Sequence, residues 1–406
     1  MVDILRPTEE AEVTQAFREA AARGQSFDIV GSGSKQRIGR PPRATAALST
    51  RNFRGVTLYE PTEFVISARA GTLLSVVEAE LAKHNQQFAF EPADVGPMLG
   101  GPAGQATIGG IVAANLSGSR RLSAGAARDH LLGVRAINGR GEAIKSGGRV
   151  MKNVTGYDVG KVLAGSWGTL ALLTEVTLKA VPRPEDIATL LLVGQPDEIA
   201  VEAMCAAMST PFEVTSAIHI DVNFTKRMLS PAARSIGRAL TALRLENFSS
   251  SVAYRLQQLQ AMFQPYGEIL TLDQTASRGF WSEVRQLSFM QGSTDPVWRI
   301  STAPRMGPHL VQAISGFTDL KVAYDWSGGL IWLEVPASAD ASAADIHRLV
   351  AIRGGEALLF RADAAIRANV DVFQPLEKPH IALTQRIKDA FDPANVLNPG
   401  RMYAYC

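Results

Sequence analysis

The chain has 406 residues, which is long for a single core, and its 46% apolar and 20% charged content is that of a globular protein with two or three domains. Its 41 basic and 39 acidic side chains leave a net charge of +2, which argues against the broad basic surface that nucleic acid requires. The two cysteines, Cys205 and Cys406, argue against a disulfide framework and against an iron–sulfur or structural zinc site.

The sequence pattern predicts no membrane span and no secretion signal. The longest apolar runs, residues 170–173 and 190–193, are strand-sized, whereas crossing a bilayer takes about 20 apolar residues. Asp3, Arg6 and Glu9 interrupt the basic-then-apolar pattern of a signal peptide. We therefore expect the protein to lie in the reducing cytoplasm.

The first 182 residues hold most of the glycines and alternate short β-type runs with turns. A helix is predicted over residues 8–23, with Thr8 as its cap and Val13 and Phe17 among the residues of its apolar face. The sequence Val181-Pro182-Arg183-Pro184 ends this pattern and marks a domain boundary. The remaining elements of this region are predicted as helices at 73–84 and 107–114 and strands at 27–30, 62–68, 131–137 and 170–179.

Beyond the boundary, strands and helices alternate more regularly, which indicates an α+β sheet with helices on one face. A hairpin is predicted through Ser327-Gly328-Gly329, and an amphipathic helix over 381–391 is ended by Asp392-Pro393. The other predicted elements are strands at 190–193, 216–221, 242–246, 297–302, 330–335 and 357–360 and helices at 196–208, 252–264, 276–289, 308–315 and 341–352.

Three glycine clusters are candidates for binding an anionic ligand. Residues 31–36, Gly-Ser-Gly-Ser-Lys-Gln, follow an apolar strand, and glycines there allow backbone N–H groups to approach a phosphate. The spacing to Gly39 does not fit a dinucleotide-binding fingerprint, and an ordinary turn explains the cluster equally well. In the second cluster, Gly109-Gly110 opens a helix where N–H groups could face a phosphate, although tight packing on a sheet is the alternative.

The third cluster joins a polar aromatic segment, residues 152–158, to a glycine-rich turn at residues 165–168 that enters a strand. A hairpin would account for this turn as well as a ligand would. None of the three clusters is specific alone, but their order along the chain is far more so.

In that order the sequence resembles the FAD-binding domain of the p-cresol methylhydroxylase and vanillyl-alcohol oxidase type, the FAD-linked oxidases. The resemblance is carried by the cluster at 31–35, by Ala-Thr-Ile-Gly-Gly at 106–110, by Gly-Ser-x-Gly-Thr-Leu at 165–170 and by Asn398-Pro399-Gly400 near the end. It is supported by Glu-Pro-Ala-Asp at 91–94 and covers nearly the whole chain, with the middle weakest. Leu-Ser-Gly-Ser-Arg-Arg at 116–121 and Lys-Asn-Val-Thr-Gly-Tyr-Asp at 152–158 look most like the FAD-binding subunits of bacterial glycolate oxidases.

The resemblance implies an α+β fold with a two-lobed FAD-binding domain at 1–182 and an α+β cap with a ferredoxin-like sheet at 183–375. A C-terminal segment, 376–406, would return to the FAD domain. The first two clusters would line the pyrophosphate and the third the adenine or ribose end, with Lys35 open between phosphate and solvent. The implied cofactor-binding residues are Gly31, Ser32, Gly33, Ser34, Lys35, Pro92, Thr107, Ile108, Gly109, Gly110, Asn115, Ser117, Gly118, Gly168, Thr169 and Leu170.

Departures from the family pattern limit the predicted role. Some members attach FAD covalently through a histidine in the first glycine loop, which has none here, so the sequence predicts noncovalent FAD. Hydroxy-acid-oxidising relatives carry His-Ala-Gly-Asp-Gly-Asn and Gly-Glu-His-Gly segments, where this chain has residues 324–330, Tyr-Asp-Trp-Ser-Gly-Gly-Leu, and 370–376. No metal site is expected because the six histidines, at 84, 130, 219, 309, 347 and 380, are isolated.

The sequence reveals no catalytic base for a substrate hydroxyl. His219 is interpreted as a structural residue within a strand. Arg299 is the one candidate for clamping a substrate carboxylate, with a structural ion pair as the favoured alternative.

The leading hypothesis is therefore an FAD-binding subunit of a multi-subunit glycolate (2-hydroxy acid) oxidase that oxidises glycolate to glyoxylate. Its partners would be a catalytic flavoprotein subunit and an iron–sulfur subunit, through which it could lie peripheral to the inner membrane. The alternatives are a self-sufficient FAD-dependent 2-hydroxy-acid dehydrogenase and a flavin-free scaffold subunit.

Overall fold

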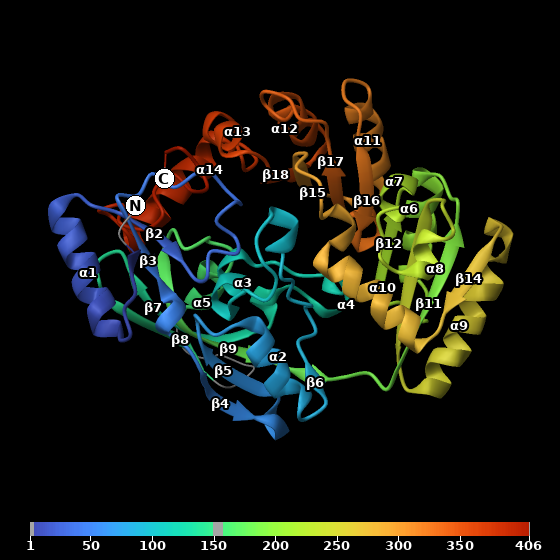
Figure 1. Cartoon of the computed structure of the whole chain (residues 1–406), viewed down its shortest axis with the longest axis horizontal. Helices are drawn as coiled ribbons and strands as arrows, with labels where there is room; N and C mark the ends of the chain where they lie inside the picture. The colour runs from blue at the N-terminus through green and yellow to red at the C-terminus, as the bar shows by residue number, and fades with distance from the viewer. Residues whose placement is uncertain (1–3, 149–156, 406) are drawn as a thin grey trace. The chain divides into compact units, whose positions relative to one another are not determined.

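A computed structural model describes residues 4–148 and 157–405, so part of the predicted motif at 152–158 lies outside the described residues. The chain divides into two compact units, whose elements are labelled in Figure 1. Unit 1 comprises Met1–Ser117, Gly125–Arg183 and Pro375–Cys406, and unit 2 comprises Gly118–Ala124 and Pro184–Gln374. The seven residues Gly118–Ala124, which lie inside the range 1–182, thus pack with unit 2.

Unit 1 has two lobes, and the first contains a parallel three-stranded sheet in the order β1-β3-β2. Helix α1 (Glu10–Arg23) buries Val13 and Phe17, which lie one turn apart, and ends at Gly24 with a φ of 63°. The Thr8 hydroxyl donates to the Glu12 carboxylate at 3.0 Å, so it does not cap the backbone as predicted; Glu9 occupies that position. The strands are β1 (Ile4–Leu5), β2 (Phe27–Val30) and β3 (Ala46–Ser49).

The second lobe is a five-stranded antiparallel sheet in the order β4-β5-β9-β7-β8. Helices α2 (Leu74–Ala82), α3 (Ile108–Ala114) and α5 (Val159–Leu163) contribute buried side chains to the same core as this sheet. The strands are β4 (Val56–Glu60), β5 (Val65–Arg69), β7 (Leu131–Asn138), β8 (Ala143–Gly147) and β9 (Ala171–Lys179), with a short pair of β6 (Gln86–Gln87) and β10 (Val181–Pro182) beside it.

The C-terminal helix α14 (Lys378–Phe391) and the residues after it complete unit 1. Lys388 is buried, and its ammonium donates to the carbonyl oxygens of Thr169 and Leu397 at 2.8 and 2.9 Å and to the Asp392 carboxylate at 2.6 Å. Asp392 in turn accepts the backbone N–H of Leu397 at 2.8 Å. A buried ammonium with three acceptors is well compensated, so this network ties the chain end to the strand entry at residue 169.

Unit 2 is built on an eight-stranded antiparallel sheet in the order β14-β11-β13-β12-β16-β17-β15-β18. Strands β16 and β17 form the hairpin predicted through Ser327-Gly328-Gly329. The strands are β11 (Asp186–Val193), β12 (Ser216–Ile220), β13 (Leu240–Asn247), β14 (Ile269–Leu272), β15 (Val297–Thr302), β16 (Lys321–Asp325), β17 (Leu330–Glu334) and β18 (Gly355–Arg361). The helices are α4 (Arg121–Ala124), α6 (Asp197–Met208), α7 (Val222–Thr225), α8 (Pro231–Arg234), α9 (Ser249–Phe263), α10 (Gln274–Gln286), α11 (Gly307–Ser315), α12 (Ala343–Arg353) and α13 (Ala364–Asn369).

Helices cover both faces of this sheet, which corrects the expectation of one covered face. Side chains alternate between faces along a strand, so Arg244 and Thr241 of β13 point in opposite directions. On the face of Arg244, here called face A, the guanidinium lies 4.3 Å from the ring centroid of Trp281 of α10. On the other face, face B, Asp197 of α6 accepts the Tyr324 hydroxyl at 2.8 Å. One-sided coverage was inferred from the alternation of strands and helices along the chain, but that alternation does not fix which face each helix covers. Strands β12 and β17 are buried along their whole length, as strands covered on both faces are.

No helix among the described residues is long and apolar enough to cross a membrane.

Candidate functional site

The first glycine loop follows β2 and lies closely against Thr107. A Cβ added at Gly31 would stand 2.5 Å from the Thr107 hydroxyl oxygen, and Gly33 has a φ of 89°, which favours glycine. The Ser49 hydroxyl donates to the carbonyl of Gly31 at 2.8 Å, and the Ser32 hydroxyl donates to the carbonyl of Gln105. The loop therefore needs glycine for close approach and is held by side chains on both sides.

The second cluster forms the first turn of α3, with Thr107 as the N-cap that accepts the N–H of Gly110 at 3.3 Å. A Cβ at Gly109 would stand 2.6 Å from the Cβ of Ala70, so this glycine is required for tight packing on β5 and the turn after it. A Cβ at Gly110 would instead lie 3.8 Å from the ammonium nitrogen of Lys35. Tight packing, one of the two alternatives that the sequence left open, is thus observed at Gly109, whereas Gly110 lies beside the Lys35 ammonium.

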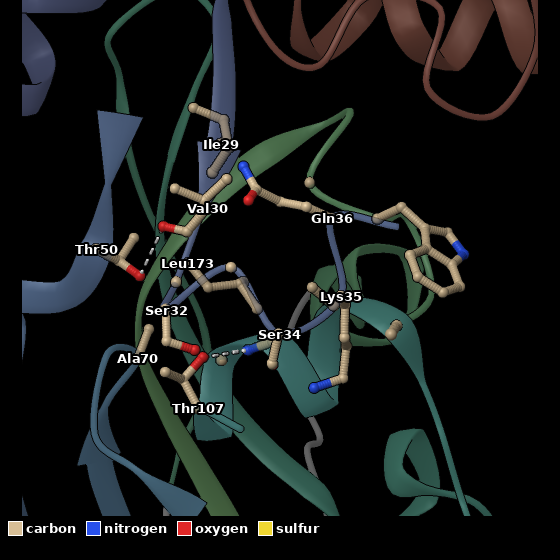
Figure 2. Close-up of a pocket in the computed structure, with 18 of the residues that line it drawn as sticks. Ile29, Val30, Ser32, Ser34, Lys35, Gln36, Thr50, Ala70, Thr107 and Leu173 are labelled. Atoms are coloured by element: carbon tan, nitrogen blue, oxygen red, sulfur yellow. Dashed lines mark hydrogen bonds between the residues drawn. The ribbon is translucent and has the colours of Figure 1, made fainter. Parts of the chain in front are cut away.

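These two clusters and the third enclose one hollow, shown in Figure 2, with about 670 Å³ of open space including the solvent at its mouth. Nine of the predicted cofactor-binding residues line it, namely Gly31, Ser32, Gly33, Ser34, Lys35, Thr107, Gly109, Gly110 and Gly168.

The other seven predicted residues are not among its lining and have local partners or buried positions. The Asn115 side chain accepts the N–H of Arg128 at 3.0 Å, and the Ser117 hydroxyl accepts that of Ala127 at 2.9 Å. The Gly118 carbonyl accepts the Trp326 indole N–H at 3.0 Å, within unit 2. The buried members of the set are Pro92, Ile108, Thr169 and Leu170.

Lys35 is the charged centre of the hollow. Its side chain is only 8% exposed, and its ammonium has no hydrogen-bond partner among the described residues. Burial lowers its pKa to about 8, partly opposed by the Asp94 carboxylate. Asp94 itself accepts backbone N–H groups of Gly96, Gly104 and Gln105 at 2.6 to 3.2 Å. A buried ammonium facing a hollow without a partner calls for an anionic ligand, because leaving it unpaired is costly.

Sequence reasoning assigned the C-terminal segment to the FAD domain but did not name Arg401 as a residue of this hollow. Arg401 lines it, and its guanidinium donates to the carbonyl of Lys35 at 3.0 Å and lies 3.6 Å from the Asp28 carboxylate. Gln36 and Trp167 also line the hollow. Arg401 could not have been assigned from sequence, because 366 residues separate it from Lys35.

Asn398 fixes the position of the third cluster. Its side-chain oxygen accepts the N–H of Ile29 at 2.7 Å, and its amide donates to the carbonyl of Trp167 at 2.8 Å. Gly168 has a φ of 72°, and a Cβ there would stand 2.8 Å from the Asn398 amide nitrogen. The turn at 165–168 thus joins α5 to β9 and is not a hairpin. Asn398-Pro399-Gly400 is a positioning segment for this hollow.

The histidines and segments considered for hydroxy-acid chemistry have structural contacts in unit 2. His219 is fully buried, its Nδ1 lies 2.9 Å from the Thr241 hydroxyl and its Nε2 lies 3.4 Å from the Asp197 carboxylate. His347 contacts Gln374 and the carbonyl of Asp371 at 3.0 and 2.7 Å, within the segment that stands in place of Gly-Glu-His-Gly. No group of three histidine, cysteine or acidic side chains that could hold a metal occurs in the described part of the chain.

Comparison with known proteins identifies the family to which the chain belongs. A profile of the FAD binding domain matches residues 3–147, and one of the C-terminal domain of FAD linked oxidases matches residues 374–402. The chain is 34% identical over 381 residues to glycolate oxidase subunit GlcE of Escherichia coli (strain K12), covering 93% of this chain and 92% of that protein. The chain belongs to the FAD-linked oxidase family.

Three further proteins are similar to this chain in sequence or in fold. It is 25% identical over 329 residues to glycolate oxidase subunit GlcD of Bacillus subtilis (strain 168), covering 73% of this chain and 68% of that protein. In fold it is similar to 4-ethylphenol oxidase from Gulosibacter chungangensis, with a TM-score of 0.73 at 12% identity over 99% of this chain and 89% of that one. p-Cresol methylhydroxylase with substrate bound gives a TM-score of 0.72 at 11% identity, covering 98% and 88%. The predicted α+β fold of this type is confirmed.

FAD is accordingly the cofactor of this FAD-linked oxidase, which is an FAD-dependent oxidoreductase component. The residues that line the hollow fit FAD. The partnerless ammonium of Lys35 suits the charge of a pyrophosphate, and Gly31 and Gly33 bring backbone close enough to meet it.

Proposed function

We propose that this chain is the FAD-binding subunit of a multi-subunit glycolate (2-hydroxy acid) oxidase, whose reaction converts glycolate to glyoxylate. The observation that carries the proposal is the buried, partnerless Lys35 in a glycine-lined hollow. It is supported by similarity to glycolate oxidase subunit GlcE over nearly the full length of both chains.

The cofactor-binding residues proposed here are those of the three clusters, with distinct roles. Lys35 would pair with a phosphate oxygen, and the backbone at Gly31–Ser34 and the first turn of α3 would surround the pyrophosphate. The seven predicted residues away from the lining would act by holding these loops in place. Asn398 is added as a positioning residue, since both ends of its amide bond to the loops. Arg401 is added as well: it bonds to the carbonyl of Lys35, and its buried Nε has no hydrogen-bond partner among the described residues.

Noncovalent attachment of FAD is part of the proposal. Covalent flavin attachment requires a nucleophilic side chain, and the described residues lining the hollow include no histidine, cysteine or tyrosine. Acid precipitation of the purified yellow protein should therefore release all of its flavin into the supernatant. Flavin remaining with the precipitate would contradict this part.

Among the described residues no side chain is assigned as the base for a substrate hydroxyl, so we propose that the catalytic steps are divided between subunits. When bound, FAD supplies two-electron redox chemistry, but oxidation of an alcohol also needs a base for the hydroxyl proton. His219 and His347, the buried histidines of unit 2, are both held by structural partners. We therefore propose that a catalytic flavoprotein subunit and an iron–sulfur subunit complete the oxidase, in the cytoplasm and peripheral to the inner membrane through those partners.

Anaerobic reduction of the bound flavin tests the proposal. With glycolate as the sole reductant, the isolated chain should keep its flavin oxidised, and addition of the catalytic flavoprotein and iron–sulfur subunits should allow reduction. Reduction of the isolated chain by glycolate or D-lactate would instead support the self-sufficient dehydrogenase. A colourless chain that binds no added FAD would support the flavin-free scaffold.

A further inference from the structure

The segment Gly118–Ala124 packs on face A of the unit 2 sheet and carries two arginines. Arg120 is paired with Glu246 of β13, its Nε lying 2.8 Å from the carboxylate. The Ser119 hydroxyl donates to the Asp325 carboxylate at 2.7 Å. Both partners are on face A, because Glu246 is two residues from Arg244, and Asp325 is two residues from Ala323, which pairs with Ile220 of β12. These two contacts anchor the segment at the residues immediately before Arg121.

Trp326 is held in one position beside this segment. It follows β16 in a turn where Trp326, Ser327 and Gly328 all have positive φ, of 50°, 57° and 100°. Non-glycine residues in this region are strained and persist where surrounding contacts enforce them, often at functional sites. Here the indole N–H donates to the carbonyl of Gly118 at 3.0 Å, and the backbone N–H donates to the Asp325 carboxylate at 2.7 Å.

Two guanidinium groups converge on this one indole ring. The guanidinium carbon of Arg121 lies 4.5 Å from the ring centroid, and that of Arg299 of β15 lies 5.2 Å from it. Burial and, after it, repulsion from the Arg121 guanidinium lower the pKa of Arg299 to about 10. Asp325 offsets part of this charge, and Glu356 contributes less because it is exposed.

Arg299 differs from Arg244, which lies on the same face, in the contacts of its guanidinium. Arg244 stacks on Trp281, donates to the Ser216 hydroxyl at 3.1 Å and lies 3.7 Å from the Glu246 carboxylate. Arg299 makes no hydrogen bond or ion pair through its side chain with any described residue. Besides the ring of Trp326, its guanidinium lies 5.9 Å from the centroid of the Trp332 ring, and the residue is partly exposed to solvent. Its five donors are therefore held in place without an acceptor.

We propose that Arg299, with Arg121 and the indole of Trp326, forms a binding site for the carboxylate of a small monocarboxylic acid on face A of unit 2. A guanidinium and a carboxylate are planar and bond through two parallel N–H···O contacts. Asp325 and Glu356 offset part of the positive charge at Arg299, which suits a monoanionic carboxylate as its ligand. The choice of a 2-hydroxy or 2-oxo acid as the natural ligand rests on the proposed function.

Binding of methoxyacetate to the full-length, FAD-loaded protein tests the site, because this acid keeps the glycolate carboxylate but has no free hydroxyl to oxidise. Ligand-detected NMR should show binding of methoxyacetate and none of 2-methoxyethanol, which has the same skeleton without the carboxylate. Arg299→Gln should weaken binding about 10- to 100-fold, the value of a charge-assisted hydrogen-bonded pair. Arg299→Lys, which keeps the charge but loses the fork, should give an intermediate affinity.

Arg278→Gln is the matched control, since Arg278 is an exposed arginine of α10 in the same unit, and it should bind methoxyacetate as the parent protein does. Equal binding by the parent protein and Arg299→Gln would overturn the proposal, as would equal binding of 2-methoxyethanol. Displacement by sulfate as readily as by acetate, at matched ionic strength, would overturn the carboxylate assignment. Because no turnover is involved, failure here leaves the proposed function standing, and a chain that never exchanges electrons with glycolate could still bind the acid.

Discussion

At the scale of single residues, Lys35 links the sequence to the cofactor. A buried ammonium that gains a phosphate partner forms a charge-assisted hydrogen bond, which contributes roughly 1.5–3 kcal/mol. Lys35→Met should therefore weaken FAD binding about 10- to 100-fold, measured by titrating the apoprotein and following flavin fluorescence. Lys145→Met, which removes an exposed lysine of the same unit, is the control and should leave the affinity unchanged. An unaltered affinity in Lys35→Met would remove Lys35 from the cofactor site.

The pKa of Lys35 also predicts how FAD affinity depends on pH. In the apoprotein this pKa is lowered from 10.5 to about 8 by burial, whereas binding of a pyrophosphate favours the protonated form. Affinity should therefore be constant below pH 8 and fall above it, by at most about tenfold per pH unit. Since the unfolded chain binds the proton more tightly between pH 8 and 10.5, apoprotein stability should gain from this group over the same range. A FAD affinity that rises above pH 8 would contradict the assignment.

Among secondary-structure elements, the contact between β2 and the turn before β9 rests on Asn398. Its replacement by alanine removes two buried hydrogen bonds and leaves the N–H of Ile29 and the carbonyl of Trp167 without this partner. Asn398→Ala should destabilise unit 1 by about 2 kcal/mol or more. Urea-induced release of flavin fluorescence reports on that unit alone, and Asn369→Ala, whose amide bonds only to Ala365 at the surface, serves as the control. Equal midpoints for the two variants would show that the contact is dispensable.

In unit 2, strand β17 carries a fully buried carboxylate, Glu334, that joins three cations. Arg227, Lys321 and Arg361 lie 2.7 to 3.0 Å from it. Burial alone would raise the pKa of Glu334, but the hydrogen bonds from Lys321 and Arg227 outweigh burial and lower it. Stability from this group is therefore present above the unfolded pKa of a glutamate and is lost as pH falls through the lower folded value.

Glu334→Gln should cost about 3–5 kcal/mol, because it leaves buried positive charge uncompensated. Near-ultraviolet circular dichroism during urea unfolding of the full chain would report the loss. The matched variant Glu268→Gln removes an exposed partner of Arg238 and should cost less than about 1 kcal/mol. Comparable losses in the two variants would contradict the importance assigned to the buried cluster.

For the whole molecule, the two units draw on distant parts of the chain. The core of the first lobe includes Val396 and Leu397 together with Phe17 and Leu48, so unit 1 cannot be completed without the C-terminal residues. A chain ending at Gln374 should therefore lose FAD binding and become sensitive to proteolysis within unit 1. A chain ending at Arg401 keeps Lys388, Asn398 and Arg401 and should retain its flavin. FAD retention by the shorter chain would show that the residues after Gln374 are dispensable for binding.

The sequence alone was sufficient to predict those features that a few neighbouring residues encode. Glycine loops, apolar periodicity and the proline pair at 182–184 are encoded within a few residues, so the predicted positions of β2, α3, β9 and the hairpin after β16 agree with the structure. The order of the glycine clusters indicated FAD and the family, since each cluster needs only its own backbone to approach a phosphate.

Tertiary structure decided what depends on contacts distant in sequence. It buried Lys35 without a partner, placed Arg401 and Asn398 against loops more than 200 residues away, and assigned Gly118–Ala124 to unit 2. It also brought Arg121 and Arg299 to one indole ring, which no spacing in the sequence indicates. The physical reason is the same in each case: burial and pairing of a charge are fixed by whichever segments pack around it, and local sequence does not record them.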